Sequence, residues 1–137
     1  MKVLVDTSVW SLAFRRKERD ERNNKIVAEL INLIRDLRVS IIGPIRQELL
    51  SGISEKKTFE ELKEKMQAFT DYVIQTADYE AAAEFSNKCR KNGIQGSHRE
   101  FLICAAAVRN EWEIFTEDTA FLNYKKHIPI RLYKIHL

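Results

Sequence analysis

The sequence is poor in the residues that staple or interrupt a chain, with two cysteines, four glycines and two prolines among 137 residues. Neither cysteine stands at the spacing of a metal site or a disulfide framework, so we expect two thiols in a reducing compartment, with Cys104 in the core. No stretch approaches the roughly 18 apolar residues of a membrane span, and no export signal opens the chain. These absences predict a cytoplasmic protein that makes no use of a membrane.

The composition that remains is typical of a globular protein, with 45% hydrophobic and 31% charged residues. We expect a single domain over residues 1–137. A net charge of +3 does not by itself indicate nucleic-acid binding. Basic residues gather within 15–25, as Arg15, Arg16, Lys17, Arg19, Arg22 and Lys25. A solvated loop with internal ion pairs is favoured over a flap that contacts phosphates.

Hydrophobic periodicity predicts short strands that alternate with helices. Strands are expected at residues 3–5, 39–42, 72–75, 114–116 and 130–137. Helices are expected at 10–14, 26–37, 44–52, 58–69, 78–90, 98–110 and 118–125, with Asn23 or Asn24, Thr58 and Asp78 among the caps. Such alternation predicts an α/β fold, a three-layer α/β/α sandwich with a mainly parallel central sheet.

Acidic residues follow several of the predicted strands. Asp6 comes directly after the first strand, and Asp118 lies two residues past another. Glu48 is about one turn into a helix that follows a strand, and Glu100 lies in the first turn of the alanine-rich helix. Because ligands of an open parallel sheet bind beyond the carboxyl ends of its strands, these carboxylates are expected to converge.

Each acid also has a purely structural explanation. Asp6 and Asp118 could cap the helices that follow them. Glu48 could be a solvated carboxylate, and Glu100 could interact with the dipole at a helix N-terminus. The joint pattern favours a shared site, in which the carboxylates would repel one another unless a cation neutralised them.

Carboxylate oxygens are hard ligands that suit Mg²⁺ or Mn²⁺. Such an ion polarises phosphoryl oxygens and lowers the pKa of a bound water, so that the water attacks near neutral pH. The predicted chemistry is metal-assisted hydrolysis of phosphodiester bonds. Its catalytic and metal-binding residues would be Asp6, Glu48, Glu100 and Asp118.

Other catalytic patterns are missing from the sequence. The glycines do not stand at the spacing of a phosphate-binding loop, the three histidines lack metal-ligand spacing, and there is no Gly-x-Ser-x-Gly elbow. We interpret His98 as a partly exposed helix-cap residue rather than a general base. Trp10 and Phe14 are interpreted as core residues rather than base-stacking platforms.

Four segments carry a family resemblance: VLVDTS at 3–8, QELLSG at 47–52, GSHREFLICAA at 96–106 and FTEDTAF at 115–121. In this order they resemble the motifs of PIN domains, and most closely those of VapC-like ribonuclease toxins of toxin–antitoxin pairs. Each motif is short, but their order and spacing are specific, and the resemblance spans nearly the whole chain.

The resemblance implies a homodimeric, Mg²⁺- or Mn²⁺-dependent endoribonuclease whose substrate is RNA and whose partner is a cognate antitoxin that also binds operator DNA. By the same resemblance Asp6 is the central metal ligand, and Glu48, Glu100 and Asp118 are the other acids. Ser8 and Thr116 would support them by hydrogen bonds to carboxylates or metal-bound water.

Two positions depart from the family pattern. Glu100 stands where aspartate is usual, and Ala120 stands where the family often has a further aspartate. These departures support an alternative, a catalytically weak PIN-fold module that binds RNA or a protein. A DNA nuclease of similar fold is less favoured, because the chain lacks the extra helices that such enzymes use on duplex DNA.

Overall fold

The structure, a computed structural model, describes residues 1–15 and 19–135. Its centre is a parallel sheet with the strand order β3-β2-β1-β4. The strands are β1 (Val3–Val5), β2 (Val39–Ile42), β3 (Asp71–Tyr72) and β4 (Glu113–Phe115). Val5 pairs with Phe115, so β1 and β4 end at the same level. The residues that follow these two strands therefore lie side by side.

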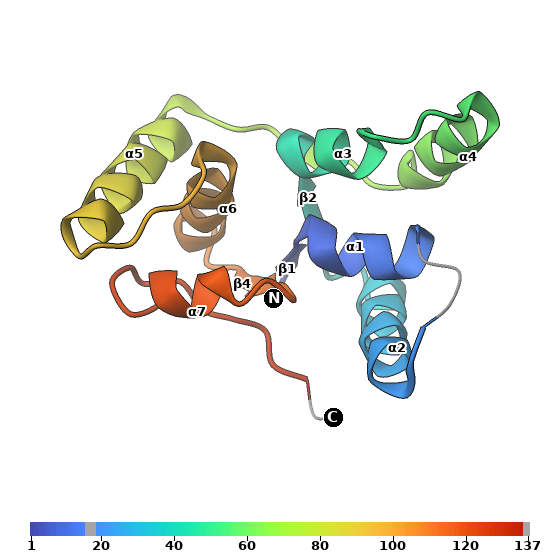
Figure 1. Ribbon diagram of the computed structural model, residues 1–137, viewed down its shortest axis with the longest axis horizontal. Helices are drawn as coiled ribbons and strands as arrows, with labels where there is room; N and C mark the ends of the chain where they lie inside the picture. Colours follow the sequence, from blue (N-terminus) through green and yellow to red (C-terminus); the bar gives the residue numbers. More distant parts are fainter. Residues whose placement is uncertain (16–18, 136–137) are drawn as a thin grey trace.

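Helices cover both faces of the sheet. They are α1 (Thr7–Phe14), α2 (Glu21–Arg35), α3 (Gly43–Leu50), α4 (Lys56–Met66), α5 (Thr76–Lys91), α6 (His98–Arg109) and α7 (Ala120–Tyr124). Figure 1 shows α5 and α6 on one side of the strands and α1 and α2 on the other. The predicted three-layer α/β/α fold with a parallel sheet is confirmed.

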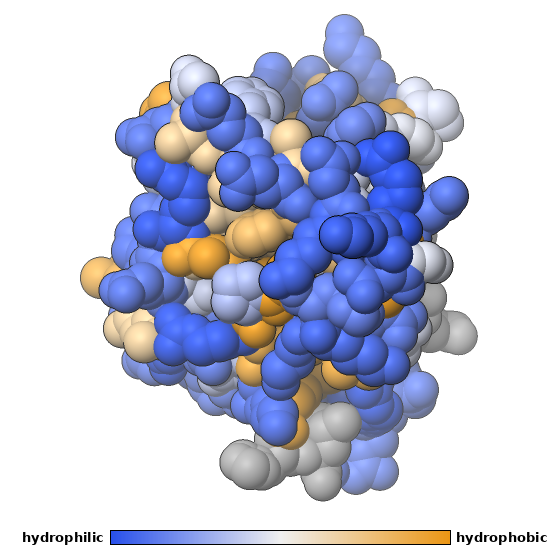
Figure 2. Space-filling view, turned by 90° about the vertical axis from the view of Figure 1, so that its left-hand side faces the viewer, coloured by the Kyte–Doolittle hydropathy of each residue, from blue (hydrophilic) through white to orange (hydrophobic). Residues whose placement is uncertain are grey.

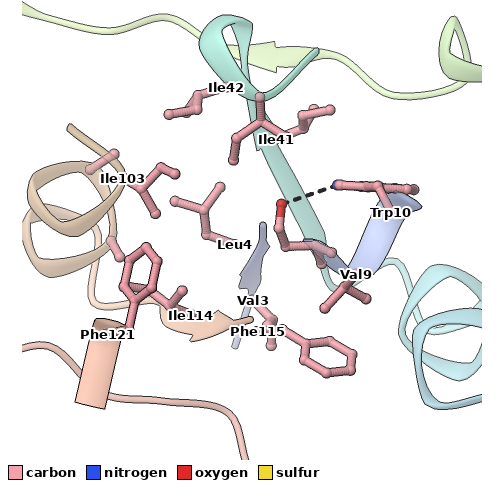
Figure 3. Close-up of a cluster of buried hydrophobic side chains, with 14 of the residues drawn as sticks. Val3, Leu4, Val9, Trp10, Ile41, Ile42, Ile103, Ile114, Phe115 and Phe121 are labelled. Atoms are coloured by element: carbon pink, nitrogen blue, oxygen red, sulfur yellow. Dashed lines mark hydrogen bonds between the residues drawn. The ribbon is translucent and has the colours of Figure 1, made fainter. Parts of the chain in front are cut away.

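The core surrounds β1, whose residues are all fully buried. Leu4 packs among Ile41, Ile103 and Ile114, which come from β2, α6 and β4 (Figure 3). A continuous apolar strand is expected where both faces of a parallel sheet are covered. The α6 segment from Phe101 to Ala107 is buried throughout, as predicted for the alanine-rich helix.

Several predicted helix ends are wrong. Asp20, not Asn23 or Asn24, caps α2, and its Oδ1 accepts a 2.7 Å hydrogen bond from the Asn23 N–H. The helix ends at Arg35, and Leu37 lies beyond it with a positive φ and 84% exposure. Helical periodicity alone predicts Leu37 on the apolar face of this helix, but the last buried residue of that face is Leu33.

The predicted basic loop is shorter than expected, because α2 begins at Glu21. Lys25 lies 3.8 Å from Glu21, the kind of internal ion pair expected for a solvated segment, whereas Arg22 pairs with Glu117 beyond β4. Arg16 and Lys17 lie outside the described residues.

Two further caps and the third strand also differ from prediction. Glu55 is the N-cap of α4, so Thr58 lies inside the helix rather than before it. Gln75 is the N-cap of α5, where Asp78 completes a capping box instead of capping the helix itself. The strand predicted at 72–75 overlaps the observed strand, Asp71–Tyr72, only at Tyr72, because Gln75 is already the N-cap of α5.

The predicted last strand at 130–137 is reduced to a bridge between Leu132 and Ile114 in the described chain, and 136–137 lie outside it. Two backbone hydrogen bonds of 2.8 Å join this segment to Ile114, one from Ile114 to Arg131 and one from Tyr133 to Ile114. The short β4 offers a partner for little more than this pair. Among the described residues no helix is both long and apolar enough to cross a membrane.

Candidate active site

Asp6 and Thr116 meet where β1 and β4 end. The Asp6 N–H donates to the Phe115 carbonyl over 2.9 Å, which extends the strand pairing by one residue. Asp6 is also the N-cap of α1, since the Ser8 N–H donates to its Oδ2 over 3.4 Å. The capping explanation of Asp6 is thus correct, but it accounts for one of several contacts.

The same oxygen of Asp6 accepts two hydroxyl hydrogen bonds. Ser8 Oγ donates over 2.7 Å, and Thr116 Oγ1 donates over 2.9 Å. In turn Ser8 Oγ accepts from the Glu117 N–H at 3.0 Å, and Thr116 Oγ1 accepts from the Asp118 N–H at 3.0 Å. Both predicted supporting residues therefore contact Asp6, and each orients the segment that carries Asp118.

Asp118 is exposed at the start of the last described helix. Its Oδ1 accepts a 2.9 Å hydrogen bond from the Ala120 N–H, although Thr119 is the formal N-cap. The backbone N–H of Asp118 is linked to Asp6 through Thr116, while the Asp118 side chain retains access to solvent. This combination suits a ligand that must bind an ion arriving from solution.

Asp6 is 6% exposed, and burial raises the pKa of its carboxyl above the ordinary value of 3.8, against the smaller opposing effect of hydrogen bonds from Ser8, Thr116 and the Thr7 and Ser8 backbone. Among residues 1–15 and 19–135 no basic side chain forms an ion pair with Asp6. A buried carboxylate without a cationic partner is unfavourable. The Asp6 carboxylate is therefore suited to a cation from outside the chain.

Glu48 lies on α3 and is engaged by the protein itself. It forms an ion pair with Arg99, which stands in the first turn of α6 beside Glu100. The two side chains are 34% and 38% exposed, and Arg99 Nε is buried without a hydrogen-bond partner among the residues that the structure describes. Sequence reasoning did not identify Arg99, because nothing in the spacing of residues 48 and 99 indicates that they meet.

Glu100 forms a capping box with Ser97. The Ser97 N–H donates to Glu100 Oε1 over 2.9 Å, and the Glu100 N–H donates to Ser97 Oγ over 3.1 Å. The Tyr124 hydroxyl donates to Oε2 over 3.0 Å. Burial acts to raise the pKa of Glu100, but these hydrogen bonds outweigh it and hold the pKa below its ordinary value. The Ser97-x-x-Glu100 pattern was readable from the sequence, whereas Tyr124 was not.

Gly96 fits closely against the ring that binds Glu100. A Cβ at this position would collide with the Tyr124 hydroxyl and come within 2.8 Å of its ring and 2.9 Å of the Phe101 ring. Glycine is therefore required here for space rather than for backbone conformation.

Three of the predicted acids influence the same interior region. Burial raises the pKa of Cys104, with smaller contributions from the charges of Glu100 and Asp6. Burial and the Glu100 hydrogen bond raise the pKa of Tyr124, to which the Asp118 charge also contributes. The charges of Asp6 and Glu100 therefore act on Cys104, and those of Glu100 and Asp118 act on Tyr124, while Glu48 pairs with Arg99 next to Glu100.

The acids are nevertheless not drawn together around one point. Within residues 1–15 and 19–135, no group of three or more acidic, histidine or cysteine side chains is arranged to hold a metal ion. The donor chemistry of Asp6 and Asp118 fits Mg²⁺ or Mn²⁺, and the uncompensated burial of Asp6 fits a cation. Glu48 and Glu100 would have to leave their present partners in order to join them.

The aromatic, histidine and cysteine residues interpreted from the sequence lie in or against the core, or at the start of α6. Trp10 is fully buried, and its Nε1 donates to the Val5 carbonyl over 3.1 Å, so the core interpretation is confirmed. Phe14 is half-buried and stacks on Trp10. His98 is exposed and begins α6, but Ser97 is the N-cap. Cys104 is buried in the core as predicted.

Among solved structures the chain is similar to FitAcB from Neisseria gonorrhoeae, with 20% identity, a TM-score of 0.76 and 96% of each chain covered. It is similar to VapBC2 from Rickettsia felis bound to a promoter DNA fragment, with 12% identity, a TM-score of 0.75 and coverage of 97% of this chain and 98% of the other. DNA-bound VapBC from Salmonella typhimurium gives 12% identity, a TM-score of 0.73 and 97% coverage of each chain.

A comparison with curated protein sequences gave no match. Residues 3–127 match the family model of the PIN domain, and this segment contains all the acids and hydroxyls described above. The chain therefore belongs to the PIN domain family.

Proposed function

We propose that this protein is a Mg²⁺- or Mn²⁺-dependent endoribonuclease and the toxin of a toxin–antitoxin pair. The observation that carries the proposal is the hydrogen-bonded unit of Asp6, Ser8, Thr116 and Asp118 at the carboxyl ends of β1 and β4. It links a buried carboxylate, which forms no ion pair with a described basic side chain, to the segment that carries an exposed one, at the ligand-binding edge of a parallel sheet.

Each residue of this unit has a defined task. Asp6 and Asp118 would hold the cation, which would supply Lewis-acid activation of the phosphate and of a bound water. Ser8 and Thr116 fix the orientation of Asp6 and leave its Oδ1 outside their hydrogen bonds. Glu100 and Glu48 would complete the acidic surface once their carboxylates turn away from Tyr124 and Arg99.

The biological setting is supported by the fold comparisons. The similar structures are titled as FitAcB and VapBC assemblies, and two of the three are bound to DNA. We therefore propose an antitoxin partner, a homodimeric state and a cytoplasmic location for this protein. RNA rather than DNA is the proposed substrate, on the resemblance of its four motifs to those of VapC-like ribonucleases.

The test is a cleavage assay on single-stranded and structured RNA, and on DNA of matched sequence, with Mn²⁺, Mg²⁺ or a chelator. Asp6→Asn and Asp118→Asn should each reduce RNA cleavage by about 100-fold or more, the loss expected for an important electrostatic contact. Asp36→Asn, at the exposed end of α2, is the matched control and should cleave normally. Cleavage that ignores both the chelator and the Asp6 substitution would refute the proposal.

A binding module that lacks efficient catalysis is the second candidate. It is favoured by the engagement of Glu48 with Arg99 and of Glu100 with Ser97 and Tyr124. It predicts RNA binding without turnover under every metal condition. A Glu100→Asp variant would then remain inactive, whereas a gain of cleavage would favour the nuclease.

A further inference from the structure

Arg99 stands at the junction of three helices. In Figure 1, α6 begins between α5 and α3, and Arg99 is its second residue. Its terminal Nη1 pairs with Glu48 of α3, while its Nε is buried and has no hydrogen-bond partner within residues 1–15 and 19–135. Buried polar groups without a partner are rare in folded proteins, so this guanidinium has an incomplete set of contacts.

The Nε atom that lacks a partner belongs to the part of the guanidinium group that binds phosphate best. A guanidinium binds a phosphate best through two parallel N–H groups, and Nε together with one terminal nitrogen forms such a fork. A single carboxylate at Nη1 leaves that fork unused. A turn of the guanidinium toward an anion would give Nε a partner that the described part of the chain does not provide.

Arg99 can be reached from solvent. It lines a groove of about 310 Å³ whose wall includes Pro44, Tyr79, His98 and Phe101. The groove runs between α5 and the start of α6, and Arg90 and Asn87 also border it. Figure 2, which views the molecule from the α5 side, shows a mainly hydrophilic surface with a narrow apolar strip near its middle. Arg90 and Arg99 both line the groove, so an anion that enters it would meet two guanidinium groups.

The ion pair that Arg99 now makes is exchangeable. Ion pairs that are about one-third exposed contribute little to stability, because water screens them. The pair also keeps the Glu48 carboxylate from the other acids, whose mutual repulsion would otherwise be unfavourable in the absence of a cation. By contrast, the pair between Arg109 and the fully buried Asp78 has no such freedom.

We infer that Arg99 is a phosphate-binding residue that exchanges Glu48 for a backbone phosphate of RNA and so releases Glu48 toward the acidic site. The inference rests on the proposed ribonuclease function and adds a positioning residue to it. Binding of RNA and binding of the cation are thereby linked through one side chain, since the same movement satisfies Arg99 and frees a carboxylate.

The first experiment measures RNA binding without turnover. A fluorescein-labelled single-stranded oligoribonucleotide is titrated with protein in chelator, and anisotropy is recorded over a range of salt concentrations. Arg99→Ala should weaken binding about tenfold, as loss of a charge-assisted contact does, and reduce the salt slope by about one phosphate. Arg99→Lys should restore the slope but only part of the affinity, because lysine lacks the fork.

Arg35→Ala, at the exposed end of α2, is the charge-matched control and should bind within about twofold of the wild type, as expected for an unrelated surface charge. Circular dichroism checks that each variant is folded.

The second experiment tests the exchange itself. Glu48→Gln removes the competing carboxylate and should tighten RNA binding in chelator, but this gain should vanish when Arg99→Ala is also present. Glu64→Gln, on the exposed side of α4, controls for the change in net charge. In a separate calorimetric titration without RNA, Arg99→Ala should bind Mn²⁺ more tightly than the wild type, because Glu48 is then released.

The outcomes separate this inference from the proposed function. If the wild type cleaves RNA but Arg99→Ala binds it equally well in chelator, the inference is wrong and the ribonuclease proposal stands. If Glu48→Gln tightens binding equally with and without Arg99, the exchange is refuted. A wild type that neither binds nor cleaves RNA contradicts both.

Discussion

Asp6 and Asp78 are two buried aspartates near the starts of helices, and their pKa values shift in opposite directions. Asp78 is fully buried, but hydrogen bonds from the Gln75 N–H, Arg109 and Tyr72 overcome the effect of burial and lower its pKa. Asp6 has hydroxyl and amide donors, and burial dominates its pKa. A buried charge is tolerated when it is paired. The fold therefore pairs Asp78 internally, whereas Asp6 forms no ion pair with a basic side chain of residues 1–15 and 19–135.

The largest expected effect is the loss of stability on replacing Asp78, whose charge is paired within the fold. Asp78→Ala removes the partner of Arg109 and the acceptor of the Tyr72 hydroxyl, whose distance is 2.8 Å. The free energy of unfolding should fall by about 3 kcal/mol, the lower end of the range for breaking a buried pair, because Arg109 is partly exposed. Urea denaturation measures this loss. A change no larger than that of the exposed Asp36→Ala would remove the contrast with Asp6.

The next largest effect concerns Asp6 and the stabilisation of the protein by Mn²⁺. Mn²⁺ at a hundredfold excess over its dissociation constant should stabilise the wild type by about 2.7 kcal/mol. Asp6→Asn should respond far less, because its amide carries no charge, whereas Asp36→Asn should respond like the wild type. Thermal denaturation at several Mn²⁺ concentrations measures this difference. Equal responses of the wild type and Asp6→Asn would show that Asp6 does not hold the ion.

A smaller effect should follow from loosening the support of Asp6. Thr116→Val keeps the shape of the side chain but removes the donor to Asp6 and the acceptor of the Asp118 N–H. RNA cleavage should fall about tenfold, as it does when the group that orients a metal ligand is lost. Thr70→Val, at an exposed position, is the control for the substitution itself. Unchanged kinetics would mean that Asp6 is oriented by Ser8 and the backbone alone.

The smallest effect is the pH dependence in metal-free buffer. The folded-state pKa of Asp6 lies above 3.8. The contribution of Asp6 to the free energy of unfolding is therefore complete below about pH 3.8 and is lost as pH rises through the folded-state pKa. Asp78 behaves oppositely, since its stabilising contribution is present above 3.8 and is lost as pH falls through its lowered pKa. Denaturation of the wild type and Asp6→Asn from pH 3 to 7 should show that the free energy of unfolding of the wild type falls relative to that of Asp6→Asn as pH rises. A constant difference would mean that Asp6 is not perturbed.

The fold and the centre of the candidate site were largely predictable from local pattern. Buried β1 ends abruptly at Asp6, and the strand predicted at 114–116 ends with Thr116, so parallel-sheet topology predicts that both residues lie at the carboxyl edge of the sheet. The structure adds that β1 and β4 are neighbours and that a 2.9 Å hydrogen bond joins the two residues. Strand ends are readable because the change from apolar to polar residues is sharp there.

The outer part of the site was not predictable, because partner choice between distant side chains depends on packing. The sequence gives Glu48 no reason to select Arg99, or Tyr124 to select Glu100. The same limit explains the misplaced start of α5, where Gln75 and Asp78 share the cap. Reciprocal caps leave a recognisable spacing only when the N-cap is one of the preferred residues.

The contact between Asp6 and Thr116 joins residues 110 positions apart. During translation β1 is made before β4 and Asp118. A nascent chain that still lacks β4 therefore holds an Asp6 without its Thr116 donor and without Asp118. Under the proposed ribonuclease function, the site would stay incomplete until the segment after β4 has been synthesised.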